Sequence, residues 1–193
     1  MKMIFIRHGE TTGDVEDRYG GAYDDGLSEH GLEQAAGLAR ELTGKGIKTV
    51  VASGLQRAQQ TGMIVAEAVG AALEVEEHFS ERDQYGALSG MVKAEARTVY
   101  PDLVDCFKDR LFTAPDAESY EAFSARVSLA FRALAENGDG VAIVWHGGGM
   151  RVLFRDILKL GELTEIGDCC WVELVKDGDD WRVGESKRIG FDF

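Results

Sequence analysis

The chain contains little cysteine, and its cysteines are poorly placed for cross-links. Three occur in 193 residues, and two of them are adjacent: Cys106, Cys169 and Cys170. An odd number of cysteines, two of them adjacent in sequence, is poorly suited to a set of disulfides. The sequence also has no CxxC pair with the spacing of metal ligands. A chain of this length buries roughly 70% of its unfolded surface, so its core needs neither cross-link nor metal. We therefore expect reduced thiols, no metal and a cytoplasmic location.

Long apolar runs and positive charge are also scarce. The N-terminal apolar run covers only residues 3–6, too short for a signal peptide, and no stretch approaches transmembrane length. The sequence has 21 Lys and Arg against 34 Asp and Glu, a formal net charge of −13. This balance disfavours nucleic acids and anionic membranes as partners. A small anionic substrate stays possible, because a cleft can be locally positive on an acidic protein.

What the sequence does have is an alternation of apolar runs with helical patterns, which predicts βαβ units and a mainly parallel sheet. Helices are expected at 28–43, from Ser53 (with Gln56 completing a capping box) to about 69, at 119–136 and at 151–160. The strands are expected at Met3–Ile6, Thr49–Ala52, Leu73–Glu76, Val141–Trp145, Trp171–Val175 and Trp181–Val183. The last two flank "KDGDD", a turn signal for an antiparallel hairpin.

This pattern predicts one domain over residues 1–193. We expect a three-layer α/β/α sandwich with a sheet of about six strands. The less regular stretch 91–118 is expected to form a small helical insertion, or lid, over the site. There is no internal repeat, low-complexity tract or linker.

Two histidines follow predicted strands directly, in "MKMIFIRHGE" and "GVAIVWHGGG". Loops that leave the carboxyl ends of parallel strands build the ligand site of such sheets. His8 and His146 are therefore expected to share one site.

Positive groups are expected around these histidines. Arg7 precedes His8, and Arg57 follows the second strand, at the same edge of the sheet. His146 is followed by Gly147, two further glycines and then a helix, so free backbone N–H groups there are expected to favour an anion. Two guanidinium groups, two imidazoles and a helix N-terminus suit a tetrahedral dianion such as phosphate.

A pocket that only bound phosphate would not need an imidazole at its centre. Neutral imidazole is a competent nucleophile near pH 7, so His8 is the candidate for a phosphohistidine intermediate. The arginines and a protonated His146 would stabilise the charge of the transition state. Glu81, in "FSERDQYGALSG", is the best-placed general acid and base.

Four ordered blocks carry a family resemblance: "RHGET", "SGLQRAQQT", the Glu81 segment and "VWHGGG". Together they resemble the histidine phosphatase superfamily, which includes the cofactor-dependent phosphoglycerate mutases, over nearly the whole chain. The resemblance implies that His8 is phosphorylated, that Arg7, Arg57 and His146 form the phosphate pocket, and that Glu81 is the acid/base. It implies no metal or organic cofactor.

The sequence departs from that family at two places. Asp14 stands where the family usually has Asn, and a carboxylate beside a phosphate dianion repels it unless it is protonated or paired. Asp14 could point elsewhere, pair with an arginine or contact an unusual substrate. The Glu81 segment also has one extra residue before Gly86, which leaves Asp83 as a less favoured acid/base.

The alcohol part of the substrate is not identified by the sequence. Arg82, Tyr85, Lys93 and Arg97 could form a basic rim that binds it, although Lys93 and Arg97 also suit an ordinary exposed helix. We expect a phosphatase acting on a small phosphorylated metabolite. The alternatives are mutase-type phosphotransfer, a metal-dependent hydrolase using His8 and His146 as ligands, and a non-catalytic phospho-ligand binding module. A homodimer is left open.

Overall fold

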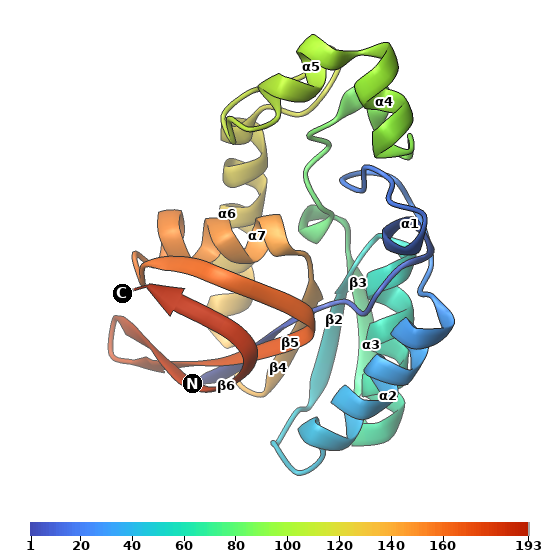
Figure 1. Cartoon of the computed structure of the whole chain (residues 1–193). Helices are drawn as coiled ribbons and strands as arrows, with labels where there is room; N and C mark the ends of the chain where they lie inside the picture. The colour runs from blue at the N-terminus through green and yellow to red at the C-terminus, as the bar shows by residue number, and fades with distance from the viewer. Residues whose placement is uncertain (193) are drawn as a thin grey trace.

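A computed structural model describes residues 1–192 and shows one six-stranded mixed sheet (Figure 1). Phe193, the last residue of the predicted domain, lies outside the described residues. The strand order is β3-β2-β4-β1-β5-β6. The strands are β1 (Lys2–Arg7), β2 (Thr49–Ser53), β3 (Ala72–Glu76), β4 (Val141–Trp145), β5 (Glu162–Asp177) and β6 (Asp180–Asp192). The first four are parallel, while β5 and β6 are antiparallel and form the predicted C-terminal hairpin.

The sheet is covered on both faces, as the sequence predicts. Strand side chains alternate between the two faces, so Met3 and Phe5 of β1 join one buried cluster, and Ile4 and Ile6 join the other. The first cluster includes side chains of α6 (Tyr120–Asn137) and α7 (Gly147–Val152). The second includes side chains of α2 (Glu29–Leu42) and α3 (Gln56–Val69). The fold is therefore a three-layer α/β/α sandwich.

Three predicted boundaries are wrong. The hairpin strands are longer than expected, because register shifts between Ile166 and Trp171 let β5 bend and continue pairing with β6. The helix predicted at 151–160 begins at Gly147 and continues as a π-turn, η3 (Leu153–Ile157). The helix α3 begins at Gln56 without a side-chain cap, because Ser53 ends β2 and its hydroxyl bonds elsewhere.

The predicted insertion at 91–118 contains two short helices, α4 (Lys93–Val99) and α5 (Pro101–Cys106). Figure 1 shows them beyond one end of the sheet, on the same side as α1 (Thr12–Val15). A small separate core made of Tyr19, Leu88, Ala96 and Val104 packs this region together. Two short 3₁₀ turns, η1 (Glu77–Phe79) and η2 (Gly86–Leu88), connect it to β3.

Within residues 1–192, no helix has both the length and the apolar composition needed to cross a membrane.

Candidate active site

The two histidines lie side by side at the carboxyl ends of two neighbouring strands. Because β1 and β4 are paired in parallel, His8 and His146 leave the sheet together, and the His8 N–H donates to the Trp145 carbonyl at 3.1 Å. The ring centroids are 5.1 Å apart. Both side chains are buried. The structure therefore brings together the two residues that the sequence placed in one site.

Hydrogen bonding defines the tautomer of His8. Its Nδ1 lies 2.7 Å from the Gly9 carbonyl, and a carbonyl only accepts, so Nδ1 carries the proton. The lone pair of a neutral ring is then on Nε2. Burial, followed by the charges of Arg57 and Arg7, lowers the pKa of His8 well below its usual value. At neutral pH the ring is therefore an uncharged nucleophile.

His146 is held by a residue that the sequence analysis assigned only to a helix cap. The Ser53 Oγ lies 2.6 Å from His146 Nε2 and also accepts the Leu55 N–H at 3.2 Å. His146 Nδ1 is buried and has no hydrogen-bond partner within the described part of the chain. Burial, then the charge of Arg57, lowers the pKa of His146 well below its usual value. The free protein thus holds this ring neutral at pH 7, while the protonated ring expected during phosphoryl transfer stays a prediction.

Arg57 is one of the most buried charges in the molecule, with 3% of its surface exposed. Its Nη1 donates to the Tyr23 carbonyl at 2.6 Å and to Asp25 at 2.9 Å, and its Nη2 donates to the Gly21 carbonyl at 2.8 Å. A guanidinium has five N–H donors, so two remain for a ligand. The loop 21–25 therefore fixes Arg57 in place and leaves part of it free.

Arg7 is held in a similar way by the start of β5. Its Nη1 donates to the Ile166 carbonyl at 2.9 Å and pairs with Asp168 at 3.0 Å. Both arginines of the expected phosphate pocket thus have one acidic partner each, which the sequence analysis did not identify. A paired guanidinium is oriented, and both arginines line the cavity.

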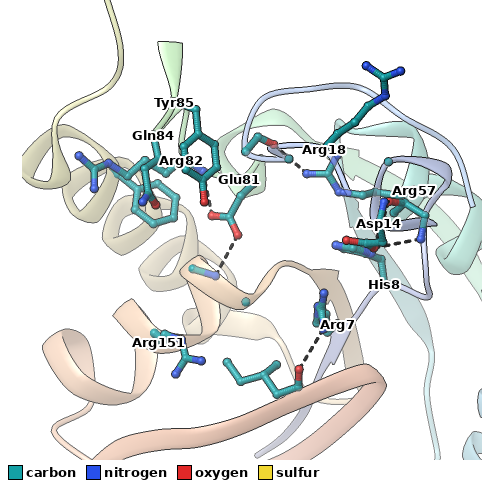
Figure 2. A pocket seen from close by; sticks show the side chains of 18 of the residues that line it. Arg7, His8, Asp14, Arg18, Arg57, Glu81, Arg82, Gln84, Tyr85 and Arg151 are labelled. Atoms are coloured by element: carbon teal, nitrogen blue, oxygen red, sulfur yellow. Dashed lines mark hydrogen bonds between the residues drawn. The ribbon is translucent and has the colours of Figure 1, made fainter. Parts of the chain in front are cut away.

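Glu81 is bound by two backbone N–H groups. Its Oε1 accepts from Arg82 at 2.8 Å and its Oε2 accepts from Gly148 at 2.9 Å, in the first turn of α7. A Cβ on Gly148 would lie 2.4 Å from Glu81 Oε1, so any other residue there would push the Glu81 carboxylate out of this position. Figure 2 shows Glu81 and His8 on opposite sides of the cavity. One of the helix N–H groups expected to bind phosphate is therefore used to position this carboxylate.

Asp83, the less favoured acid/base, lies in a different environment. Its Oδ1 accepts from the Gly86 N–H at 3.1 Å and from the Ser89 hydroxyl at 3.2 Å, which closes the turn before η2. It is not among the residues that line the cavity. Of the two carboxylates, the structure places only Glu81 against the site.

Asp14 lines the cavity and caps α1. Its Oδ2 accepts from the Thr11 N–H at 3.1 Å and from the Thr11 hydroxyl at 3.0 Å, which completes a capping box. No arginine pairs with it among the described residues. The carboxylate is exposed, and Figure 2 shows it beside His8. It therefore has a structural role and also brings negative charge close to the site.

These residues surround one cavity of about 560 Å³. Gly147, Arg82, Tyr85 and Lys93 also line it, but Arg97 does not. Arg82 is buried and donates to the carbonyls of Arg110, Phe112 and Glu118, so it holds the segment after α5 rather than presenting a free charge. The described residues contain no group of three His, Cys, Asp or Glu side chains that could hold a metal ion.

Sequence reasoning missed several residues of the site: Ser53, Asp25, Asp168, Arg110, Arg151 and Arg155. Two of these residues lie within or next to the sequence blocks that carry the family resemblance. Ser53 begins the "SGLQR" block, and Arg151 follows His146 by five residues. Asp25 and Asp168 have no local signal, because their partners lie 32 and 161 positions away in the chain.

Comparisons with known proteins agree on the family. The sequence profile of the histidine phosphatase superfamily (branch 1) matches residues 3–187. A 2,3-bisphosphoglycerate-dependent phosphoglycerate mutase of Parvibaculum lavamentivorans is 32% identical over 173 residues, covering 83% of this chain and 81% of that protein. A metal-independent phosphoserine phosphatase of Arabidopsis thaliana is 28% identical, covering 82% and 69%.

Solved structures are similar along almost the whole chain. The mycobacterial glucosyl-3-phosphoglycerate phosphatase in complex with VO₃ has a TM-score of 0.82 and 26% identity, with 94% of this chain and 96% of that chain covered. Other relatives are longer: this chain spans 45% of a bifunctional protein of Mycobacterium tuberculosis that is 32% identical over 164 residues. The profile match and the shared fold show that the chain belongs to the histidine phosphatase superfamily, branch 1.

Proposed function

We propose that the protein is a phosphatase that hydrolyses a phosphate monoester through a phosphohistidine on His8, with Glu81 as the general acid and base. One observation carries the proposal. The bond from His8 Nδ1 to the Gly9 carbonyl leaves the Nε2 lone pair on a buried neutral ring, at a cavity whose opposite side holds Glu81. A nucleophile and a proton donor on opposite sides of a phosphorus atom are the groups that in-line displacement needs.

In the first step, His8 Nε2 attacks phosphorus and the bond from phosphorus to the ester oxygen breaks. Protonated Glu81 gives its proton to the leaving oxygen, so the alcohol departs neutral and Glu81 becomes a carboxylate. The remaining N–H groups of Arg7 and Arg57 stabilise the transferring group, together with the unpartnered His146 Nδ1. The Ser53 hydroxyl can donate to a neutral His146 Nε2 or accept from a protonated one, so it suits both forms of the ring.

In the second step, the Glu81 carboxylate takes a proton from water while the water oxygen attacks the phosphohistidine. The nitrogen–phosphorus bond breaks, inorganic phosphate forms, and His8 and Glu81 return to their starting states. The same carboxyl group thus acts first as acid and then as base, and its two backbone hydrogen bonds orient it toward the cavity.

Mutase-type transfer is the alternative, because the curated relatives include both mutases and phosphatases. Two observations support hydrolysis. The solved structure with 26% identity over nearly the whole chain is a phosphatase, and Asp14 places a carboxylate beside His8. A location in the cytoplasm and a homodimer stay predictions.

The test is to trap the phosphoenzyme. With a radiolabelled phosphate ester, we expect acid-labile, base-stable phosphorylation and steady release of inorganic phosphate. His8→Ala removes both, with activity falling by more than about 1000-fold, while the exposed histidine variant His30→Ala keeps both. Phosphoryl transfer to a second alcohol that exceeds phosphate release would show a mutase. Ligand binding without turnover by the wild-type protein would show a binding module.

A further inference from the structure

The cavity is lined by more basic than acidic residues, although the protein as a whole is acidic. Eight of its lining residues are Lys or Arg and three are Asp or Glu, whereas the whole chain has a net charge of −13. A single phosphoryl group uses Arg7 and Arg57 in the proposed reaction. The other positive residues extend away from His8, so their hydrogen bonds decide which of them are free for the rest of a substrate.

Three of these six cations are already paired with a carboxylate. Arg18 bonds Glu16, and Lys93 bonds Asp17. Arg155 pairs with Glu162 and Asp156 and also donates to the Tyr120 hydroxyl. An ion pair of this kind offers little net charge to a ligand.

Three arginines of the cavity have no carboxylate partner among the described residues, namely Arg82, Arg110 and Arg151. Arg82 uses four of its five N–H donors in hydrogen bonds to three carbonyls and the Thr113 hydroxyl. Arg151 spends one donor, on the Leu163 carbonyl. The Arg110 side chain spends none that the structure shows in residues 1–192. Among these three arginines, the unused N–H donors are therefore mainly those of Arg110 and Arg151.

Both free arginines are supported by the fold. Arg151 lies on α7 four residues after Gly147, so the two share one face of the helix, and both line the cavity. Its bond to Leu163 fixes the half-buried guanidinium against the start of β5. Arg110 lies on the segment after α5, where its own carbonyl accepts from Arg82 at 2.7 Å. Arg82 is adjacent to Glu81, so this bond links the Arg110 segment to the proposed acid/base.

We infer that the natural substrate has a second anionic group, separate from the phosphoryl group that reacts, and that Arg151 and Arg110 bind it. This inference rests on the proposed function. Carboxylates and phosphates both match the planar donor array of arginine, and either one would supply the negative partner that these two guanidinium groups lack.

The test compares pairs of phosphate esters in which one member carries an additional anionic group. Glycerol 3-phosphate and 3-phosphoglycerate differ only in a hydroxymethyl group against a carboxylate. Fructose 6-phosphate and fructose 1,6-bisphosphate test a second phosphate. In at least one pair, we expect about 10-fold or more higher kcat/KM for the member with the additional anionic group, the gain expected of a charge-assisted hydrogen bond. The pair that shows the preference identifies the anion.

Variants then assign the preference to residues. Arg151→Gln and Arg110→Gln reduce it by about 10-fold or more, leave 4-nitrophenyl phosphate hydrolysis within about 3-fold, and act mainly on KM. Arg97→Gln, an exposed arginine outside the cavity, changes neither. Binding of the same four esters to His8→Ala, measured by calorimetry, tests the preference without turnover.

Failure of this inference is distinguishable from failure of the proposed function. A protein that forms phosphohistidine and hydrolyses 4-nitrophenyl phosphate, but shows no preference within either pair, overturns the second anion site alone. An anion preference in binding to His8→Ala, without any phosphoenzyme in the wild type, supports the anion site and refutes the phosphatase. A preference that both glutamine variants retain assigns the anion to other residues and also overturns the inference.

Discussion

At the scale of single residues, the chemical role of each acid follows from its hydrogen-bond partners. Glu81 and Asp83 are two positions apart, and both carry a carboxyl group. Two backbone N–H groups turn Glu81 toward the cavity, whereas a glycine N–H and a serine hydroxyl hold Asp83 in a turn. Although the segment before Gly86 is one residue longer than the family pattern, Glu81 still reaches the cavity.

Glu81→Gln separates the two steps of the proposed reaction. With an alkyl phosphate, whose leaving oxygen needs a proton, we expect turnover to fall by about 100- to 10,000-fold. With 4-nitrophenyl phosphate the leaving group departs without a proton, so His8 is still phosphorylated, but no base activates water. The phosphoenzyme should accumulate, as quench-flow with acid-labile phosphate counting would measure.

Asp83→Asn is the matched control, because it changes a nearby carboxylate outside the cavity. It should keep both activities and cost about 1 kcal/mol of unfolding free energy, because its two turn hydrogen bonds are weakened. Equal losses for alkyl and aryl esters in Glu81→Gln would contradict its role as a proton donor. A loss of turnover in Asp83→Asn alone would transfer that role to Asp83.

At the scale of secondary structure elements, the four-residue helix α1 shows how one side chain can serve both the fold and the site. Asp14 caps this helix through Thr11, and asparagine has a carbonyl oxygen that can accept the same N–H. The capping geometry therefore does not require the negative charge. The charge itself lies beside the position where a phosphate dianion would bind.

Asp14→Asn should therefore raise kcat/KM for small dianionic phosphate esters by about 2- to 10-fold, the effect of removing a repulsion of roughly 1 kcal/mol in a partly solvated site. Its stability should stay within about 0.5 kcal/mol of the wild type, measured by urea unfolding. Asp179→Asn, in the turn of the hairpin, removes the same charge far from the site and should leave activity unchanged. A large loss of activity in Asp14→Asn would show instead that the carboxylate binds the substrate.

Elements were predictable from the sequence where local pattern decides them. The buried runs of β1 and β4 and the histidines that follow them were identified correctly, because strand periodicity and the position after a strand are local properties. The start of α3 was predicted wrongly. Ser53 is a residue type that often caps helices, and only the folded chain places His146 within hydrogen-bond distance of its hydroxyl. Arg82 shows the same limit. The sequence around it predicts a cation that binds substrate, but its N–H groups donate to carbonyls of residues 28 to 36 positions away in the chain.

At the scale of the whole molecule, folding buries two imidazoles between a pair of guanidinium groups. Burial first, and then the charge of Arg57, lowers the pKa of both His8 and His146 well below the usual value of 6.5. The unfolded chain restores the usual value. Below pH 6.5 the unfolded state therefore takes up protons that the folded state does not, and the free energy of unfolding must decrease as the pH falls through this range.

The prediction is a measurable slope. Between pH 6.5 and 5.5, above the range where ordinary carboxylates titrate, each buried histidine should contribute up to about 1.4 kcal/mol per pH unit to the loss of stability. Urea unfolding of the wild type at several pH values would measure it. His8→Asn should remove about half of the slope, since one of the two buried rings is gone, while His30→Asn, at an exposed position, should leave it intact. A wild-type stability that stays level across this window would mean that the two rings are not held neutral by the fold, and the uncharged nucleophile on which the reaction depends would lose its structural basis.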